Sequence, residues 1–382
     1  MAWPQNKLIA DRGISPFFGE ARCLLIEKKL KKKSAAKEWI KAILFAFITI
    51  VLFRIFFFEA FTIPTPSMEK PLLTGDYILV SKINYGQRLP ITLLSFPFAQ
   101  QRLPFTENTK SYFDWIEIPY IRLFGPPDIE HNDVVVFNYP MEDEHPVDQR
   151  TYYVKRCVAI AGDTLEIRRG QVYINSKYND VPEKLQFNYK ILSDTDTIDT
   201  EEFTKLGITE GGKLHNKGEY WFTLDAEGKQ KIEKIEHVVS AEPLFEKKGR
   251  YNDYMFPESE HFLWNVDFFG PVYIPKQGDS VKLTSENLPL YERIISVYEK
   301  NNLHISNDSI FINDKYSNQY IFKMNYFFMM GDNRHNSADS RFWGFVPEDH
   351  IVGKTILVLL SIDKSETGSN IRWDRWFKGL SP

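Results

Sequence analysis

The pattern of hydrophobic positions divides the chain near residue 63. Residues 42–58 form an apolar run with a single charge, Arg54. Lysines gather just before this run: Lys28, Lys29, Lys31, Lys32, Lys33, Lys37 and Lys41. With its apolar neighbours on both sides, the run reaches the ~20 residues that a helix needs to cross ~30 Å of hydrocarbon. The pattern therefore predicts one transmembrane anchor at residues 38–62.

The lysine cluster indicates the orientation of this anchor. Cytoplasmic flanks of transmembrane helices carry an excess of Lys and Arg. We therefore expect residues 1–37 to form a cytoplasmic basic segment and everything after residue 63 to lie on the outer side. Residues 56–61 lack the small-residue pattern of a signal-peptide cleavage site, which favours an anchor that is retained. The alternative for this segment is an amphipathic or buried helix.

Beyond the anchor, short runs rich in β-branched and aromatic residues alternate with Gly, Pro, Asn and Asp. The clearest runs are 77–83, 133–139, 151–160, 164–168, 171–174, 321–330 and 355–361. Short strands with frequent turn signals are typical of antiparallel sheets and differ from alternating βαβ units. We therefore expect a mainly β protein, with a single N-terminal transmembrane helix followed by an antiparallel β core that carries a large inserted lobe.

The lobe is predicted from weaker periodicity between the strand runs. Residues 171–320 contain many charges and an aromatic cluster, and they separate a first core part at 63–170 from a second at 321–382. One faint repeat is present, because residues 172–178 (VYINSKY) resemble residues 310–316 (IFINDKY). Duplication and chance similarity between two hairpins are both open as explanations.

Composition excludes several classes of protein. The chain has 47 Lys and Arg against 51 Asp and Glu, a formal net charge of −4, which argues against a generally basic nucleic-acid binder. With 43% hydrophobic and 15% aromatic residues it is not a disordered chain. Its two cysteines, Cys23 and Cys157, cannot build a disulfide framework or a multi-cysteine zinc site. An anchor between them would also place them on opposite sides of the membrane.

Ser67 is the first residue that suggests chemistry. It follows Pro64 and Pro66, whose rings fix φ and would hold a hydroxyl in a defined direction. A serine among prolines is more often simply part of a turn. Lys70 completes an S-x-x-K pattern, but that mechanism places Ser and Lys one turn apart on a helix. Pro71 opposes such a helix, so we interpret Lys70 as uninvolved.

Lys155 is the better partner for a serine nucleophile. On a strand it shares one face with Tyr153, Cys157 and Ala159, so the amine would project among mostly apolar neighbours. Desolvation lowers a lysine pKa from ~10.4 and produces a neutral amine that accepts a proton. A lysine on an exposed strand face is the more common alternative.

Four segments in order carry a resemblance to a known family. They are P-T-P-S-M at 64–68, D-V-V-V-F at 133–137, the lysine segment 153–163, and G-D-N-R-H-N-S-A-D-S-R at 331–341. The chain resembles the bacterial type I signal peptidases, the membrane-bound Ser/Lys leader peptidases, over residues 38–170 and about 321–375. The last segment is long and highly specific.

The resemblance implies a role for each matching residue. Ser67 would be the nucleophile and Lys155 the general base. Thr65 occupies the position of a family serine that helps form the oxyanion hole, and Ser337 matches a serine that orients the lysine amine.

Residues with supporting roles follow from the same match. Asp339 and Arg341 match a structural ion pair that supports the site, and we expect Asp332 and Arg156 to form another. His335 stands where family members often carry Asp, and we interpret it as tolerated variation and not as a catalytic histidine.

The implied activity is that of a serine endopeptidase. It would cleave secreted preproteins after small-x-small sites such as Ala-x-Ala, through an acyl-enzyme, with the substrate bound as an added strand. No metal or other cofactor is required. The expected partners are membrane-tethered preproteins and the bilayer, with the secretion translocon as a further candidate and no nucleic acid. The expected location is the bacterial inner membrane.

Two features leave alternatives open. Apolar residues in 89–105, such as Leu93, Leu94, Phe96 and Phe98, would either contact lipid or be buried under the lobe. The activity has two alternatives: a soluble Ser/Lys self-cleaving repressor, which the membrane segment disfavours, and a catalytically inactive, membrane-anchored β-rich binding protein of the secretory pathway.

Overall fold

The computed structural model describes residues 17–179, 184–196, 198, 200–208, 210–307, 309–365 and 368–380. Side chains are described from residue 36 onward, apart from those of residues 200, 201, 204, 364, 365, 368 and 369. It divides into two units, residues 1–54 and 55–382. Residues 1–16 of the predicted cytoplasmic segment lie outside the described residues.

The first unit is occupied by helix α1 (Phe17–Phe56). Within it, Ala36–Phe56 is long and apolar enough to cross a membrane, with a mean hydropathy of 2.2. The predicted anchor extends too far, because Phe58–Thr62 forms strand β1, which pairs with the following strand. The apolar residues of β1 prolonged the hydrophobic run in the sequence although they belong to a sheet.

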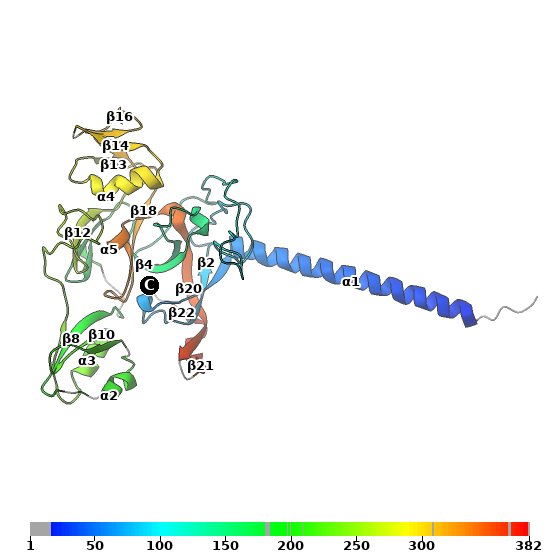
Figure 1. Ribbon diagram of the computed structural model, residues 1–382, viewed down its shortest axis with the longest axis horizontal. Helices are drawn as coiled ribbons and strands as arrows, with labels where there is room; N and C mark the ends of the chain where they lie inside the picture. The colour runs from blue at the N-terminus through cyan, green and yellow to red at the C-terminus, as the bar shows by residue number, and fades with distance from the viewer. Residues whose placement is uncertain are drawn as a thin grey trace, which may run out of the picture. The chain divides into compact units, whose positions relative to one another are not determined.

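The second unit is built on one antiparallel sheet (Figure 1). In spatial order its strands are β1, β2 (Asp76–Ser81), β20 (Ile351–Ser365), β3 (Val134–Asn138), β4 (Tyr152–Ala159), β18 (Tyr326–Met330) and β19 (Val346–Pro347), with β21 (Gly368–Ile371) and β22 (Lys378–Gly379) also paired to β20. The mainly β fold class is thereby confirmed. The run predicted at 321–330 is two strands, because Ile321 ends β17 (Gln319–Ile321) and β18 begins five residues later.

The central strands are buried on both faces, which explains their continuous hydrophobic sequences. Every residue of β3 and of β18 is buried. The sheet curls, since the Phe61 ring of β1 meets the Tyr152 ring of β4 edge to face at a centroid distance of 4.7 Å. The curl brings the segment after β1 close to β4.

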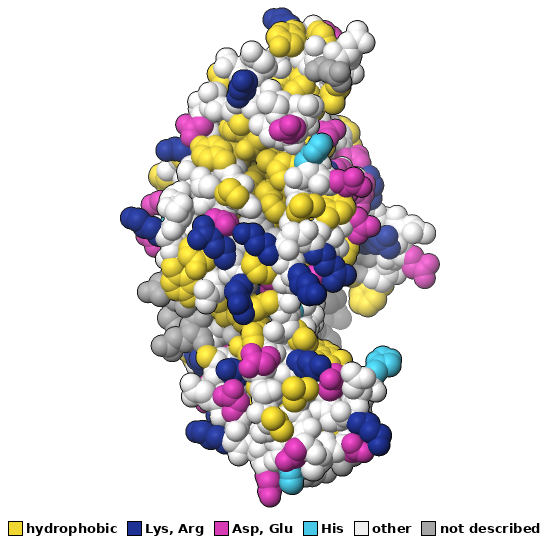
Figure 2. Space-filling view, turned by 90° about the vertical axis from the view of Figure 1, so that its left-hand side faces the viewer, with side chains coloured by type: hydrophobic (Ala, Val, Ile, Leu, Met, Phe, Trp, Pro, Cys, Tyr) yellow, Lys and Arg dark blue, Asp and Glu magenta, His cyan; other side chains and the backbone are white. Residues whose placement is uncertain are grey.

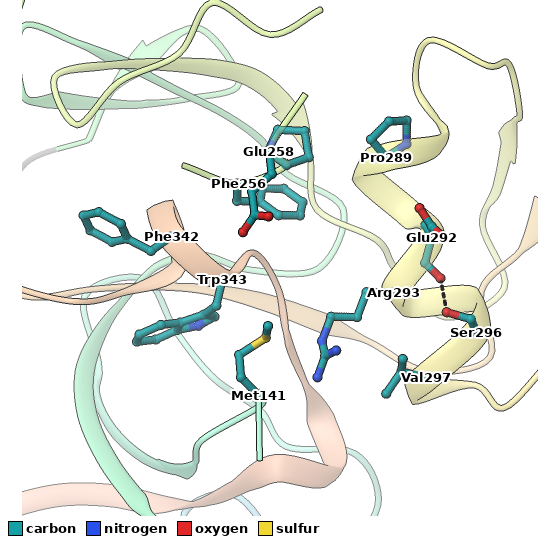
Figure 3. Close-up of a pocket in the computed structure, with 11 residues that line it drawn as sticks. Met141, Phe256, Glu258, Pro289, Glu292, Arg293, Ser296, Val297, Phe342 and Trp343 are labelled. Atoms are coloured by element: carbon teal, nitrogen blue, oxygen red, sulfur yellow. Dashed lines mark hydrogen bonds between the residues drawn. The ribbon is translucent and has the colours of Figure 1, made fainter. Parts of the chain in front are cut away.

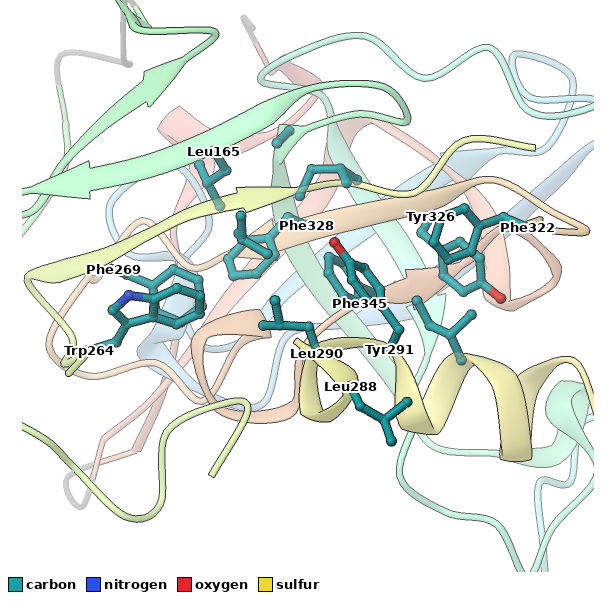
Figure 4. Close-up of a cluster of buried hydrophobic side chains, with 14 of the residues drawn as sticks. Leu165, Trp264, Phe269, Leu288, Leu290, Tyr291, Phe322, Tyr326, Phe328 and Phe345 are labelled. Carbon is teal, nitrogen blue, oxygen red and sulfur yellow. The ribbon is translucent and has the colours of Figure 1, made fainter. Parts of the chain in front are cut away.

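A chain of aromatic rings joins this sheet to part of the middle region (Figure 4). Trp264 packs on Phe269 at 4.4 Å, Phe269 on Phe328 of β18 at 5.4 Å, and Phe328 on Phe345 at 6.5 Å between centroids. The Tyr291 ring lies parallel to that of Phe345 at 6.4 Å. Aromatic pairs of this kind add to the free energy gained by burial. This part of the predicted lobe therefore shares one hydrophobic core with the central sheet.

The elements around that shared core are short. They are β5 (Thr164–Arg168), β6 (Gln171–Ile174), β7 (Lys177–Tyr178), β12 (Phe268–Tyr273), β13 (Ser280–Lys282), α4 (Leu288–Arg293), β14 (Leu303–Ser306), β15 (Ser309–Ile312), β16 (Lys315–Tyr316) and α5 (Ser340–Trp343).

The rest of the middle region has a core of its own. It contains β8 (Phe187–Ser193), α2 (Thr200–Lys205), β9 (Gly211–Lys213), β10 (Glu219–Leu224), α3 (Ala226–Ile232) and β11 (Val238–Pro243). The four strands form one sheet in the order β11-β8-β10-β9 around a separate buried cluster. The boundaries 171 and 320 of the lobe stay a prediction.

The sequence repeat corresponds to two hairpins with the same geometry. In β6–β7 and β15–β16 the two turn residues have positive φ: 52° and 65° at Asn175 and Ser176, and 52° and 62° at Asn313 and Asp314. Positive φ angles at both central residues are the signature of a type I′ turn, which favours Asn and Asp. The shared sequence therefore encodes a shared turn.

Charge is unevenly distributed over the surface despite the small net charge. On the face shown in Figure 2, a band of Lys and Arg side chains lies between a hydrophobic area above it and a region of mixed charge below it. The negative net charge of the chain therefore does not describe the charge of each face.

Replacing Phe328, which is fully buried in the shared core, tests that core. Phe328→Ala should lower the free energy of unfolding by about 3–5 kcal/mol, because it removes ring contacts and leaves a cavity. Denaturant unfolding in detergent measures the change. Phe377→Ala is the matched control, since Phe377 is 68% exposed; equal losses for both variants would contradict the assignment of this core.

Candidate active site

Ser67 lies in a tight turn between β1 and β2. The turn is the short 3₁₀ helix η1 (Pro66–Met68), preceded by Thr65 in an extended conformation. The Glu69 N–H donates to the Pro66 carbonyl at 3.0 Å, and Met68 is buried in the core beneath. Pro66 suits the first position of a helical turn because its missing N–H has no partner there. Two prolines and a buried Met therefore hold Ser67 in place.

Lys155 reaches Ser67 from β4. The lysine Nζ and the serine Oγ are 2.6 Å apart, and Nζ also lies 3.2 Å from the Val154 carbonyl. Lys155 is 3% exposed and Ser67 is 8% exposed. The two side chains therefore meet in a setting almost without solvent.

Burial changes the acidity of the lysine. Desolvation lowers the pKa of Lys155 to about 8, although the nearby carboxylates Asp339 and Asp332 oppose this shift. Arg341 acts in the same direction as burial. At neutral pH a useful fraction of the amine is uncharged, so it can accept a proton.

The two other predicted hydroxyl residues lie close by. The Thr65 Oγ1 is 3.3 Å from the Ser67 Oγ. Ser337 donates to the Ala338 carbonyl at 3.4 Å and also bonds the Asp339 carboxylate, whose pKa it helps to lower. The predicted orientation of the lysine amine by Ser337 stays a prediction.

Gly331 is required between Ser337 and the nucleophile. A Cβ at this position would lie 2.2 Å from the Ser337 Oγ and 2.6 Å from the Ser67 carbonyl oxygen. Real Cβ atoms do not approach other atoms so closely. The glycine that opens the 331–341 segment therefore lets that segment lie directly against Ser67.

Two buried ion pairs hold this segment. Arg156, next to Lys155 on β4, binds both oxygens of Asp332 at 2.8 and 2.7 Å. Arg341 binds both oxygens of Asp339 at 2.9 and 2.8 Å. All four side chains are at most 1% exposed. Bidentate pairs of this kind fix position as well as contributing energy.

Asn333 contacts the nucleophile through its backbone. Its N–H donates to the Ser67 carbonyl at 3.1 Å, and its amide donates to the Pro66 carbonyl at 3.4 Å. The same amide also donates to Glu210 at 3.0 Å, and Glu210 accepts a second bond from Asn336. Sequence reasoning missed both Asn333 and Glu210. Asn333 could have been found, because it belongs to the G-D-N motif of the 331–341 segment. No sequence pattern around Glu210 linked that residue to the site.

His335 joins the segment to the middle region. Its Nδ1 accepts from the Asn188 N–H at 3.0 Å, so its Nε2 carries the proton and donates to Asp267 at 2.8 Å. The ring packs edge to face on Phe187 and Phe245. These contacts give His335 a structural role, which agrees with its interpretation as a non-catalytic residue.

Lys70 is occupied elsewhere. Its Nζ lies 3.3 Å from the Asp225 carboxylate, at the start of α3. The S-x-x-K pattern thus does not bring Lys70 to the serine through a helix, and Ser67 lies in a 3₁₀ turn instead.

One side of β4 is open next to the site. Strand β3 pairs with residues 152–156 of β4, whereas β18 pairs only with residues 156–159. In the described part of the chain, residues 152–155 therefore have a strand on one side only. Such an edge can accept an extended peptide through backbone hydrogen bonds.

A separate pocket of about 320 Å³ opens near α4 and α5 (Figure 3). Its lining residues are Met141, Phe256, Pro257, Glu258, Pro289, Glu292, Arg293, Ser296, Val297, Phe342 and Trp343. Trp343 packs on Tyr153 at 5.5 Å, and the Tyr153 ring lies 5.6 Å from the Lys155 Nζ. Neither Ser67 nor Lys155 lines this pocket. The candidate active site is therefore identified by the hydrogen bond between these two residues and not by a cavity.

Among the described residues, no group of three or more His, Cys, Asp or Glu side chains is arranged to hold a metal ion. Cys157 is fully buried, and burial raises the pKa of its thiol, so it is an unreactive core residue. The side chain of Cys23 lies outside the described residues.

The comparisons with known proteins identify the family. The profile described as "Signal peptidase, peptidase S26" matches residues 36–227 and 274–360, well over half of the chain. The chain belongs to this family. It is a serine endopeptidase, and the match extends into the predicted lobe up to residue 227 and resumes at 274.

Individual relatives agree with the family. Signal peptidase I of Buchnera aphidicola subsp. Acyrthosiphon pisum is 27% identical over 345 residues, 89% of this chain and 80% of the relative. Signal peptidase I of Aquifex aeolicus is 25% identical over 319 residues, 83% of this chain and 82% of the relative. That of Rickettsia canadensis is 31% identical over 145 residues, 38% of this chain and 45% of the relative.

The buried Arg156–Asp332 pair predicts a stability effect in this peptidase. Asp332→Asn should lower the free energy of unfolding by about 3–5 kcal/mol, because it leaves the buried guanidinium without a charged partner. Denaturant unfolding measures the loss. The control is Glu166→Gln, which breaks the more exposed pair with Arg168 and should cost no more than about 1 kcal/mol. A loss no larger than that of the control would contradict the structural role of the pair.

Proposed function

We propose that this peptidase is a membrane-anchored Ser/Lys endopeptidase that removes N-terminal signal peptides from secreted preproteins after small-x-small sites. The observation that carries the proposal is the 2.6 Å contact between the Lys155 Nζ and the Ser67 Oγ. Family membership supports the substrate class, and the geometry supports the assignment of roles.

The reaction begins with proton transfer from Ser67 to the neutral Lys155 amine. The Ser67 oxygen attacks the scissile carbonyl, and the C–N bond breaks as the lysine returns the proton to the leaving amine. Lys155 then activates water, which hydrolyses the acyl-enzyme and releases the serine. The low pKa of Lys155 suits both steps, since a general base works best when its pKa lies near the ambient pH.

Thr65 is a candidate oxyanion donor. Its hydroxyl lies 3.3 Å from the Ser67 Oγ, close to where an attacked carbonyl oxygen would develop charge. Together with the Ser67 N–H it would stabilise the tetrahedral intermediate, and removing one such donor costs about 10²-fold or more in rate. Ser337 would orient the lysine amine.

The substrate would bind as an added strand on the open edge of β4. Residues 152–155 offer backbone groups directly beside Lys155. An extended peptide there would present its carbonyl to Ser67.

The membrane arrangement completes the proposal. Helix α1 would span the bilayer once with the lysine-rich end in the cytoplasm, and the catalytic unit would face the outer side of the bacterial inner membrane. The translocon is a candidate partner in delivering preproteins.

The second candidate is an inactive binding protein of the secretory pathway. A binding protein would not need a buried lysine at hydrogen-bond distance from a serine, because burying an amine costs free energy without contributing to peptide binding. The Ser67–Lys155 contact therefore favours the enzyme.

Cleavage of a preprotein with an Ala-x-Ala site by the detergent-solubilised full chain tests the roles. Ser67→Ala and Lys155→Ala should each lower kcat/KM by at least about 10³-fold with an unchanged melting temperature. Lys155→Arg should also be inactive, because a guanidinium stays protonated. Lys70→Ala is the matched lysine control and should keep its activity. An active Lys155→Ala enzyme would overturn the general-base assignment.

The pKa of Lys155 predicts the pH dependence. Because the pKa is lowered to about 8 and the neutral form is the base, kcat/KM should fall as pH drops below that value. The fall should approach about tenfold per pH unit. A rate profile between pH 6 and pH 9 with a short peptide measures it, and a flat acidic limb would contradict a neutral-amine base.

A further inference from the structure

A long excursion between β2 and β3 forms an irregular hairpin, here called the arm, at residues 87–124. Its two sides are joined by isolated antiparallel bridges, Arg88↔Arg122, Thr92↔Glu117, Ser95↔Tyr112 and Arg102↔Lys110. The turn lies at residues 103–109, where the Leu103 N–H donates to the Thr109 carbonyl at 3.0 Å. The arm therefore has a defined backbone although it contains no regular strand.

The arm exposes its large apolar side chains. Those at least 36% exposed are Leu93, Leu94, Phe96, Phe98, Phe105, Phe113, Trp115, Ile121, Leu123 and Phe124. Phe105 and Phe124 are 108% and 91% exposed. Burial under the lobe, one of the two alternatives for this segment, is thereby wrong for the residues named from its sequence.

Several polar groups of the arm face the protein. Asp148 accepts bonds from the N–H groups of Ile91 and Thr92 at 2.8 Å and from the Thr92 hydroxyl at 2.7 Å. Arg122 donates to the Ile351 carbonyl at 2.6 Å, and Arg88 donates to the Asp349 carbonyl at 2.6 Å.

Further along the arm, polar contacts reach the loop between β3 and β4. The Tyr112 hydroxyl bonds the His145 ring at 2.7 Å, and Gln101 donates to Glu142 at 3.0 Å. The arm is thus fastened to the catalytic unit by hydrogen bonds, while its large apolar side chains and the charged side chains of Glu107, Lys110 and Asp114 are exposed. The concentration of large exposed apolar side chains distinguishes the arm from an ordinary loop that faces water.

The arm begins at the end of the sheet where the chain leaves α1. Phe58, the first residue of β1, pairs with Ser81, the last residue of β2. The Lys82 N–H donates to the Phe57 carbonyl at 2.8 Å, one residue beyond the end of α1. If α1 spans the bilayer, connectivity alone therefore starts the arm close to the bilayer surface.

We propose that the arm is a second membrane contact, which inserts its Phe, Trp and Leu side chains into the lipid–water interface. Aromatic residues favour this zone, and long basic side chains extend from it to the headgroups. Lys110 and Arg102, beside the turn, are placed for that second role. The inference rests on the proposed membrane span of α1 and not on the Ser/Lys chemistry.

Such a contact would orient the catalytic unit. One attachment through α1 leaves the unit free to rotate about the start of β1, whereas a second attachment fixes its tilt. Ser67 follows the far end of β1, so the tilt sets the height at which the nucleophile meets a membrane-tethered preprotein. The arm thus favours substrates held in the same bilayer.

Labelling of the full chain in vesicles tests the contact. Single cysteines at Phe105 and Phe124 are introduced in a Cys23→Ser background, where buried Cys157 does not react, and labelled with an NBD fluorophore. In phosphatidylcholine–phosphatidylglycerol vesicles, lipids with a nitroxide near the headgroup should quench both probes at least about twofold more than a probe at Ile305→Cys. Ile305 is the matched control, since it is 60% exposed on β14.

A probe in α1 separates this inference from the proposed anchor. Quenching of a probe at Ile48→Cys by lipids with a nitroxide on the acyl chain reports that α1 lies in the bilayer, because Ile48 is well inside the candidate span. If the Ile48→Cys probe is quenched but the arm probes are quenched no more than the Ile305→Cys probe, the arm proposal alone is overturned. No quenching at Ile48→Cys would overturn the anchor and the arm together. If the arm probes become shielded from solvent without lipid, and more so at higher protein concentration, the arm contacts a second copy of this chain. That result would also overturn the proposal.

Activity provides an independent readout through a variant that replaces three exposed residues of the arm by serine: Phe105→Ser, Trp115→Ser and Phe124→Ser. In vesicles this variant should raise the KM for a membrane-inserted preprotein about fivefold or more, because the substrate is less well positioned. Cleavage of a short soluble peptide should be unchanged, which shows that the Ser/Lys site is intact.

The matched control replaces three exposed apolar residues outside the arm: Tyr254→Ser, Leu263→Ser and Ile305→Ser. It should change neither KM. Equal effects of the two triple variants on the preprotein, or an equal loss for preprotein and soluble peptide in the arm variant, would contradict the proposal.

Discussion

A lysine amine held 2.6 Å from a serine hydroxyl, with both side chains nearly removed from water, is the interaction on which the proposed chemistry depends. An exposed lysine is charged at neutral pH and cannot accept a proton. Burial on β4 lowers the pKa of Lys155 to about 8, so the uncharged form is within reach. The fold supplies this setting through the curl of the central sheet, which brings the turn after β1 against β4.

The segment 331–341 keeps the two side chains in register. Its glycine lies against the Ser67 carbonyl, and Asp332 binds the arginine next to Lys155, so one loop contacts the supports of both residues. Glu210 and His335 extend this framework into the middle region. That region is therefore part of the structure that positions the nucleophile, in addition to any role of its outer surface.

Much of this could be predicted from the sequence, because the chemistry resides in short motifs with fixed spacing. The alternation around Lys155 placed its amine among mostly apolar neighbours, although an exposed strand face was the more common alternative. The prolines around Ser67 predicted a defined direction for its hydroxyl, and the structure holds it in a 3₁₀ turn. The anchor was placed too far along the chain, since a strand as apolar as β1 is indistinguishable from the end of a membrane helix in a hydropathy pattern. Glu210 could not be found, because its contact with Asn333 depends on how a distant sheet packs. The direction of the apolar side chains of the arm likewise depends on hydrogen bonds formed only in the folded chain.

The ionisation of Lys155 in the folded enzyme is the most direct test of the central claim. Nitrogen NMR of ¹⁵N-lysine-labelled protein in detergent, with the Lys155 signal assigned from its loss in Lys155→Gln, follows the amine through a pH titration. A midpoint near 8 is the expected result. A midpoint at the ordinary lysine value of ~10.4 would mean that the amine is charged at working pH, and would contradict its role as the base.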